Sequence, residues 1–159
     1  MPIPEFIQTL RRQIGTELLL LPAVTGVVLD DAGRVLLGRR ADTGRWGLIG
    51  GIMEPGEDVA DAVVREVIEE TALRVRPLRI TGVYTHPDVV HVNGDRSCYV
   101  VTAFRCGVIG GQPRVNDDES LEVGWFALDD LPPLHPIYAE QLDDALRDDV
   151  AAAFRPPTR

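Results

Sequence analysis

The segment spanning residues 54–70 constrains this chain most, because it concentrates acidic residues on a predicted helix. It contains seven acidic residues and a single basic one, Arg65. Residues 58–71 include neither glycine nor proline, follow Pro55 and Gly56, and carry aspartates in their first turn, where the helix dipole favours negative charge. This pattern predicts an α-helix over residues 58–71.

Three glutamates gather on one side of this helix. At about 100° per residue, Glu66, Glu69 and Glu70 lie within roughly 100° of one another, beside the apolar arc that would face a core. Like charges repel at this spacing, and partial burial disfavours the charged form of a carboxyl group. A hard divalent cation such as Mg²⁺ resolves the conflict, because it takes carboxylate oxygens as ligands. The alternative is a solvated acidic face.

A glycine pair, Gly50-Gly51, follows a short strand-like stretch over residues 46–49. Glycine lets the backbone approach a ligand closely, and its carbonyl group can coordinate a metal. Such a pair is also typical of an ordinary turn, so the pair alone decides nothing.

The remaining pattern mixes strands with a few helices and lacks a regular alternation, which indicates an α+β fold with a mixed sheet. An apolar stripe at spacings of three and four predicts a helix over residues 5–21, ended by Pro22, which either packs on its own domain or makes a dimer contact. The pattern predicts strands over residues 23–29, 34–38, 76–84, 97–106 and 121–126, a hairpin turn at 93–94, a loop over 107–118 and a closing helix over 136–153.

Charge and cysteine content narrow the function classes. With 25 acidic against 16 basic residues the net charge is −9, which argues against holding nucleic acid or an anionic membrane by charge alone. A phosphate-bearing ligand would need a cation beside it. Cys98 and Cys106 lie on one predicted strand roughly 26 Å apart, too far for a disulfide. No apolar run reaches membrane-spanning length and no signal-peptide order is seen, so we expect a soluble, cytoplasmic protein.

The stretch 51–57, seven further residues, and then 65–73 (Arg-Glu-Val-Ile-Glu-Glu-Thr-Ala-Leu) closely resemble the Nudix box. That box consists of Gly, five residues, Glu, seven residues, Arg-Glu, an aliphatic, any residue, Glu-Glu, any residue, Gly and an aliphatic, and every charged position matches. Two positions depart: Ala72 stands where the family has Gly, and Ile49 where many members have Pro. Glycine at the former position forms a left-handed helix cap.

The resemblance implies a Nudix-type α/β/α sandwich with a central mixed sheet. It covers roughly residues 22–150, which indicates an N-terminal helical extension over 1–21, a Nudix domain over 22–154 and a tail over 155–159. It also implies a Mg²⁺- or Mn²⁺-dependent pyrophosphohydrolase acting on a nucleoside diphosphate linked to another moiety, with ADP-ribose-like compounds and nucleoside triphosphates both open. A catalytically weak nucleotide-binding regulatory module is the alternative. An isoprenoid diphosphate isomerase shares the fold, but needs a reactive cysteine near the site.

The resemblance implies roles for particular residues. The metal ligands would be Glu66, Glu69, Glu70 and the carbonyl group of Gly50. Glu57 and Gly51 would be structural, and Arg65 would orient a glutamate. The general base is open between Glu69 and Glu119, which lies in a later loop and would be a base, a further ligand or a solvated acid. Candidates for substrate contact, each of which could instead pack or lie in an ordinary loop, are Trp46, Tyr84, His86, His91 and Arg96.

Overall fold

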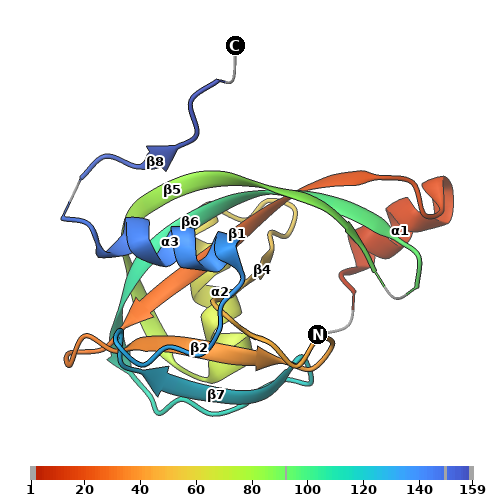
Figure 1. The fold of residues 1–159 in the computed structure, drawn as a ribbon. Coiled ribbons are helices and arrows are strands. Elements are labelled where there is room, and N and C mark those ends of the chain that lie inside the picture. The colour runs from red at the N-terminus through yellow and green to blue at the C-terminus, as the bar shows by residue number, and fades with distance from the viewer. Residues whose placement is uncertain (1–2, 92, 149, 158–159) are drawn as a thin grey trace.

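The computed structural model describes residues 3–91, 93–148 and 150–157, and helices cover both faces of its mixed sheet (Figure 1). The strands are β1 (Leu19–Leu29), β2 (Val35–Arg40), β3 (Trp46–Gly47), β4 (Ile49–Ile52), β5 (Arg74–Val90), β6 (Arg96–Gly110), β7 (Ser120–Phe126) and β8 (Ala153–Phe154). The helices are α1 (Glu5–Ile14), α2 (Val59–Thr71) and α3 (Pro136–Leu146). The predicted α+β sandwich is confirmed.

Strand β1 lies near the centre of the sheet, whose main path runs β3-β2-β1-β6-β5-β8. It pairs in parallel with β6, and β4 pairs antiparallel with its other edge. In that antiparallel pair Thr25 lies opposite Gly50, and Val24 lies opposite Gly51. The glycine pair is therefore part of the sheet, and it places backbone that carries no side chains directly under helix α2.

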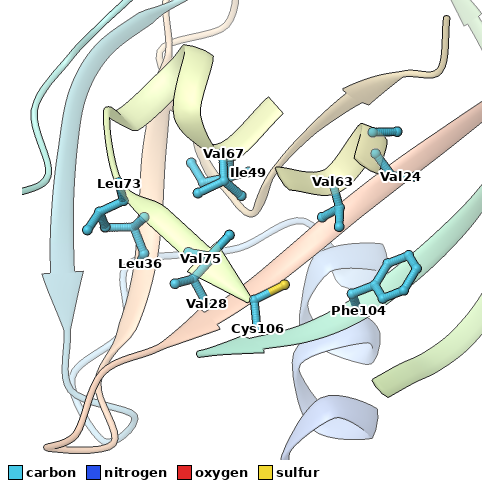
Figure 2. Packing of buried hydrophobic residues seen from close by; sticks show 11 residues of the cluster. Val24, Val28, Leu36, Ile49, Val63, Val67, Leu73, Val75, Phe104 and Cys106 are labelled. Carbon is cyan, nitrogen blue, oxygen red and sulfur yellow. The ribbon is translucent and has the colours of Figure 1, made fainter. Parts of the chain in front are cut away.

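The two faces of β1 supply two separate cores. Val28 belongs to the cluster that Val63 and Val67 of α2 complete, whereas its neighbour Val27 packs in the cluster under Leu142 of α3. Figure 2 shows the first cluster, with the α2 valines directed at the sheet. The alternation follows from the strand period of two residues, and it fixes α2 and α3 on opposite faces.

The N-terminal helix is shorter than the sequence predicts. Helix α1 ends at Ile14, and Gly15 follows with a φ of 62°. The helix prediction over 15–21 is wrong, because the four leucines at 18–21 lead into β1, whose first residues pair with β6. Leu20 is 63% exposed and Leu21 is 4% exposed, which is the alternation of a strand. Proline 22 consequently lies inside β1 and does not end a helix.

Other boundaries also shift. The predicted strand 46–49 divides into β3 and β4, while β5 and β6 run beyond the predicted 76–84 and 97–106 to form a long hairpin. This lengthening shortens the predicted loop 107–118 from its beginning. The closing helix stops at Leu146, because Arg147 is extended and the chain returns to pair β8 with β5.

Neither cysteine forms a disulfide, as predicted. Across the three described ranges, no helix has the length and apolar character needed to cross a membrane.

The end of α2 yields a stability prediction. Ala72 has a φ of 58° and a ψ of 8°, the left-handed conformation in which the box pattern has glycine. We expect Ala72→Gly to raise the free energy of unfolding by about 1 kcal/mol, because glycine adopts positive φ without the steric cost of a Cβ atom. In a chain of this length that corresponds to about 2–4 °C in Tm, measurable by thermal and chemical unfolding.

The matched control is Ala60→Gly, at an exposed position of the same helix with ordinary helical backbone. Because Ala60 lies in the first turn of α2, the substitution should lower the free energy of unfolding by at most about 1 kcal/mol, the value for a helix interior. Destabilisation by both substitutions would contradict the assignment of strain to Ala72.

Candidate active site

Glu66 is a buried acid whose position follows from the packing of its helix. Burial of Val63 and Val67 against the sheet turns the intervening side of α2 toward β4, and Glu66 is only 4% exposed there. Its carboxylate rests on Gly51, where a Cβ atom would stand 2.6 Å from the carboxyl carbon and both oxygens. The missing side chain at residue 51 is thus the space that this carboxylate occupies.

Glu70 lies one turn further along α2, between two strands. Its Oε1 accepts a hydrogen bond of 3.1 Å from the backbone N–H of Gly50, and its Oε2 lies 4.0 Å from where a Cβ atom of Gly38 in β2 would stand. A Cβ atom on Gly50 itself would stand 2.2 Å from the carbonyl oxygen of Val24, so no side chain fits there. The N–H of Gly50 therefore contacts the acidic cluster, while coordination by its carbonyl group stays a prediction.

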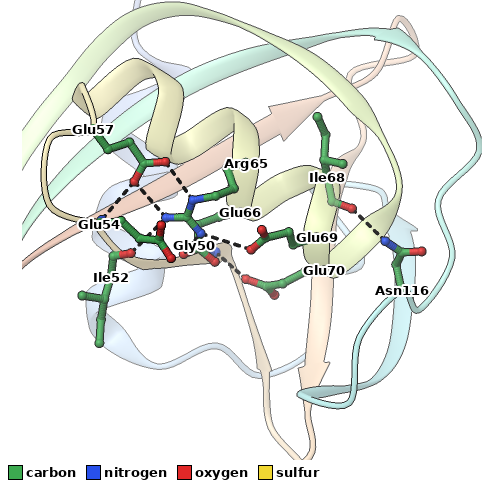
Figure 3. A network of polar contacts seen from close by, with 10 residues as sticks. All are labelled: Gly50, Ile52, Glu54, Glu57, Arg65, Glu66, Ile68, Glu69, Glu70 and Asn116. Carbon is green, nitrogen blue, oxygen red and sulfur yellow. Dashed lines mark hydrogen bonds and ion pairs between the residues drawn. The ribbon is translucent and has the colours of Figure 1, made fainter. Parts of the chain in front are cut away.

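Arg65 joins the acidic residues into one network (Figure 3). Its Nε and Nη2 donate to the two oxygens of Glu57 at 2.7 and 2.9 Å, a bidentate pair. Its Nη1 donates to Glu66 at 2.8 Å and to Glu69 at 3.1 Å, and Nη2 also reaches the carbonyl oxygen of Ile52. One guanidinium group therefore fixes three glutamates and the end of β4.

These acids fall into two groups by the direction in which their pKa values shift. The hydrogen bond from Arg65 lowers the pKa of Glu57. Burial raises the pKa of Glu66 to about 7 despite Arg65, and the charges of Glu69 and Glu119 add to the rise. Burial likewise raises the pKa of Glu70 to about 8, with Glu66 adding to it and the N–H of Gly50 opposing. The groups around Glu66 and Glu70 therefore do not compensate fully for the loss of hydration of their charged forms.

The chemistry of this donor set fits a divalent cation. Within the described ranges, no three histidine, cysteine or acidic side chains form a metal-holding cluster, and Arg65 and Gly50 donate hydrogen bonds to the carboxylates of Glu66 and Glu70. Burial nevertheless raises the pKa of both Glu66 and Glu70, and the charge of Glu66 adds to the rise at Glu70. The charged pair therefore requires positive charge, and Mg²⁺ and Mn²⁺ prefer carboxylate oxygens. The guanidinium of Arg65 is already directed at Glu57, Glu66 and Glu69.

A loop over residues 111–119 brings further acids to the end of α2. Oδ1 of Asp117 accepts hydrogen bonds of 3.2 Å from the N–H groups of Glu119 and Ser120. The carbonyl oxygen of Glu119 accepts from the N–H of Ala41 at 2.7 Å. The charges of Asp117 and Glu119 both act on Glu70, so the loop that carries the predicted base lies beside the acidic cluster.

Two predicted substrate residues take the packing roles that the sequence left open. Trp46 meets the ring of Phe126 edge-to-face at a centroid distance of 4.7 Å, within the core under α3. Tyr84 is 2% exposed, and its hydroxyl group donates to Asp144 at 2.7 Å. Tyr84 therefore offers a nucleotide almost no accessible surface in this structure.

The other candidates lie on the long β5–β6 hairpin, in the part nearest its turn. His86 lies 3.1 Å from the amide nitrogen of Gln141, and its ring centroid is 6.4 Å from that of Tyr138. Burial lowers the pKa of His86. Arg96 instead pairs with Asp88 at the exposed far end of the β5–β6 hairpin, beside α1 (Figure 1), where His91 also contacts Tyr99. The structure thus places His86 against α3, and Arg96 at the exposed end of the hairpin.

Sequence reasoning missed two residues near the acidic cluster. The hydrogen bond to Asp42 raises the pKa of Arg40, and the charges of Tyr138 and Glu119 add to that rise. The Tyr138 ring fills the space above Gly47, where a Cβ atom would stand 2.8 Å from it. An arginine pair just before the box of an acidic chain was the available signal for Arg40, whereas Tyr138 looked like one member of an apolar helix stripe.

Comparison with known proteins agrees with this geometry. Residues 19–146 match the NUDIX domain family model. The chain is 41% identical over 125 residues to a MutT-like protein of Streptomyces ambofaciens, covering 78% of this chain and 75% of that protein. It is 35% identical over 127 residues to an ADP-ribose pyrophosphatase of Methanocaldococcus jannaschii, covering 79% and 72%. The crystal structure of a Streptococcus suis ADP-ribose pyrophosphatase aligns with a TM-score of 0.65 at 26% identity, covering 83% and 96%.

Fold, acidic cluster and relatives together define a pyrophosphohydrolase that acts on nucleotide derivatives. The chain belongs to the Nudix family and is a Nudix hydrolase, a class of enzymes that generally use divalent metal ions.

The contact between Glu66 and Gly51 gives a direct test of the site. We expect Gly51→Ala to displace the Glu66 carboxylate, because the added methyl group would lie 2.6 Å from its atoms. Mn²⁺ affinity, measured by electron paramagnetic resonance titration of the purified protein, should fall about tenfold or more. Gly124→Ala in β7 is the control, since its Cβ atom would meet Phe126 at an ordinary 3.5 Å. Equal Mn²⁺ affinity in both variants would show that this contact does not shape the site.

Proposed function

We propose that the protein is a Mg²⁺- or Mn²⁺-dependent pyrophosphohydrolase that cleaves a nucleoside diphosphate linked to another moiety, with ADP-ribose-like compounds as the first substrate class and nucleoside triphosphates as the second. The observation that carries this proposal is the pair of carboxyl groups of buried Glu66 and half-buried Glu70, which are held against the Gly50-Gly51 backbone. Two relatives named as ADP-ribose pyrophosphatases support the first class. A nucleic-acid partner is not expected, and a homodimer and a cytoplasmic location remain predictions.

The chain's own residues would bind the cation and orient the groups around it. Glu66, Glu69 and Glu70 would hold it, with the Gly50 carbonyl group as an additional ligand. A bound divalent cation supplies positive charge that offsets repulsion between a nucleophile and the diphosphate, and it acidifies water. Arg65 keeps Glu66 and Glu69 in place, and it does so from a position fixed by its bidentate pair with Glu57.

The general base is assigned to Glu119, with Glu69 as its rival. The side chain of Glu69 is 40% exposed, so water can reach its carboxylate. Arg65 holds its Oε2. Glu119 lies on the exposed loop whose charge acts on both Glu66 and Glu70. Either carboxylate would accept the proton of the attacking water.

The environment of the cysteines argues against the isomerase alternative. Burial raises the pKa of Cys106 to about 12, and its side chain lies in the core cluster beside Val28 and Val75 (Figure 2). A thiol in that state is unreactive. Cys98 lies on the same strand, and both follow the box in sequence.

A substrate panel tests the proposed function. ADP-ribose, other nucleoside diphosphate derivatives and nucleoside triphosphates are incubated with the protein and Mg²⁺ or Mn²⁺, and the products are identified by mass. We expect hydrolysis of a phosphoric anhydride bond to a nucleoside monophosphate, dependent on added metal and strongly reduced in the control Glu70→Gln. Metal binding without turnover of any member would favour the regulatory nucleotide-binding module.

Paired substitutions distinguish the two candidate bases. We expect Glu119→Gln to lower kcat by about 10²–10⁴-fold, because a general base contributes on that order. Glu69→Gln should weaken metal activation as well, since Glu69 is also a proposed ligand. If Glu119→Gln keeps full turnover while Glu69→Gln abolishes it, the assignment of the base to the loop is wrong.

A further inference from the structure

The last turn of α2 is joined to the loop over residues 111–119 by hydrogen bonds. A helix leaves its final carbonyl groups without partners inside the helix. Here the side-chain amide of Asn116 donates to the carbonyl oxygen of Ile68 at 3.1 Å, as Figure 3 shows, and its backbone N–H donates to that of Glu70 at 3.2 Å. The N–H of Arg114 donates to the carbonyl oxygen of Thr71 at 3.0 Å.

Glu70 takes part in both this junction and the acidic cluster. Its backbone carbonyl accepts from Asn116, while its side-chain carboxylate accepts from the N–H of Gly50. The loop is therefore fastened to a residue whose carboxyl group lies between β2 and β4. A displacement of the loop at Asn116 changes the surroundings of that residue directly.

The path from Asn116 to Glu119 is short and internally fixed. Three residues of chain span at most about 10 Å, so Glu119 cannot lie far from this anchor. Asp117 fixes the intervening turn through its two hydrogen bonds to the N–H groups of Glu119 and Ser120. On the far side, the Ala41 N–H holds the carbonyl oxygen of Glu119. The location of the Glu119 side chain consequently depends on an anchor at each end of the turn.

We propose that Asn116 is a positioning residue, which fastens the loop to the last turn of α2 and so sets the distance between Glu119 and the α2 carboxylates. This inference rests on the proposed function, in which Glu119 is a base or a further metal ligand. Asn116 itself need not touch substrate or metal. A purely structural helix cap would stabilise α2 in the same way, but its loss would not act through Glu119.

A double-mutant cycle separates positioning from capping. Asn116→Ala, Glu119→Gln and the double variant are compared with the parent protein for kcat, KM and Mn²⁺ affinity, the last by electron paramagnetic resonance without substrate. We expect Asn116→Ala to lower kcat or Mn²⁺ affinity about tenfold with a small change in KM. In the Glu119→Gln background the same substitution should cause no further loss. Thr71→Val is the matched control. It removes a buried hydroxyl that donates to the carbonyl oxygen of Val67 and accepts from the N–H of Leu73 at the same helix end, without removing a hydrogen bond to the loop over residues 111–119.

The outcomes distinguish this inference from the proposed function. Equal losses from Asn116→Ala in both backgrounds, or the same loss in Thr71→Val at matched stability, would overturn the positioning role. Glu119→Gln without effect on either readout would overturn it too. A parent protein that turns over no member of the panel would refute the proposed function alone, since Mn²⁺ affinity would still show whether Asn116 acts through Glu119.

Discussion

The burial of carboxyl groups against bare backbone is the constraint on which the rest of this structure depends. The Glu66 carboxylate occupies the space that a side chain at residue 51 would fill, and the Glu70 carboxylate accepts a hydrogen bond from the backbone N–H of Gly50. Such burial opposes ionisation, and the surrounding groups do not offset it fully. The chain therefore keeps an unfavourable feature in its interior. Energetically unfavourable local features of this kind are concentrated at functional sites.

The sheet topology serves this constraint. Strand β4 carries the glycine pair, and its pairing with the central β1 fixes that backbone at the middle of the fold and not on a flexible loop. On the other side of the contact, Val63 and Val67 hold α2 at close range through the core cluster shown in Figure 2. Because rigid elements form both sides, the distance between the α2 acids and the β4 backbone is set by packing.

The acidic helix could be predicted because its information is local. The spacing of Glu66, Glu69 and Glu70 places them on one side of any α-helix, and the glycine expected by the box pattern identifies the left-handed end that Ala72 adopts. The N-terminal helix was overextended for the opposite reason. Residues 18–21 satisfy a helical spacing and a strand alternation equally, and only the distant partner strand β6 decides between them.

Contacts between distant segments decide what the sequence left open at the site. Trp46 and Tyr84 carry groups suited to ligand binding, but whether a ring packs or stays accessible depends on α3, some ninety or sixty residues away by sequence number. The role of Asn116 was equally invisible, since its partner Ile68 lies 48 residues earlier. Composition gives the net charge of the chain, but it does not tell which arginines form ion pairs with acidic residues.

The pairing of those arginines bears directly on how an acidic protein can attract a phosphate. Arg65 directs its donors at Glu57, Glu66 and Glu69, and Arg40 makes a bidentate pair with Asp42. Positive charge near the site is therefore largely committed to holding acids in place. A polyphosphate approaching Glu66 and Glu70 would meet net repulsion unless further positive charge arrived with it. Divalent cations bind phosphate oxygens and carboxylates together, so the cation proposed to offset the charge of these acids would also make the site attractive to a phosphate-bearing substrate.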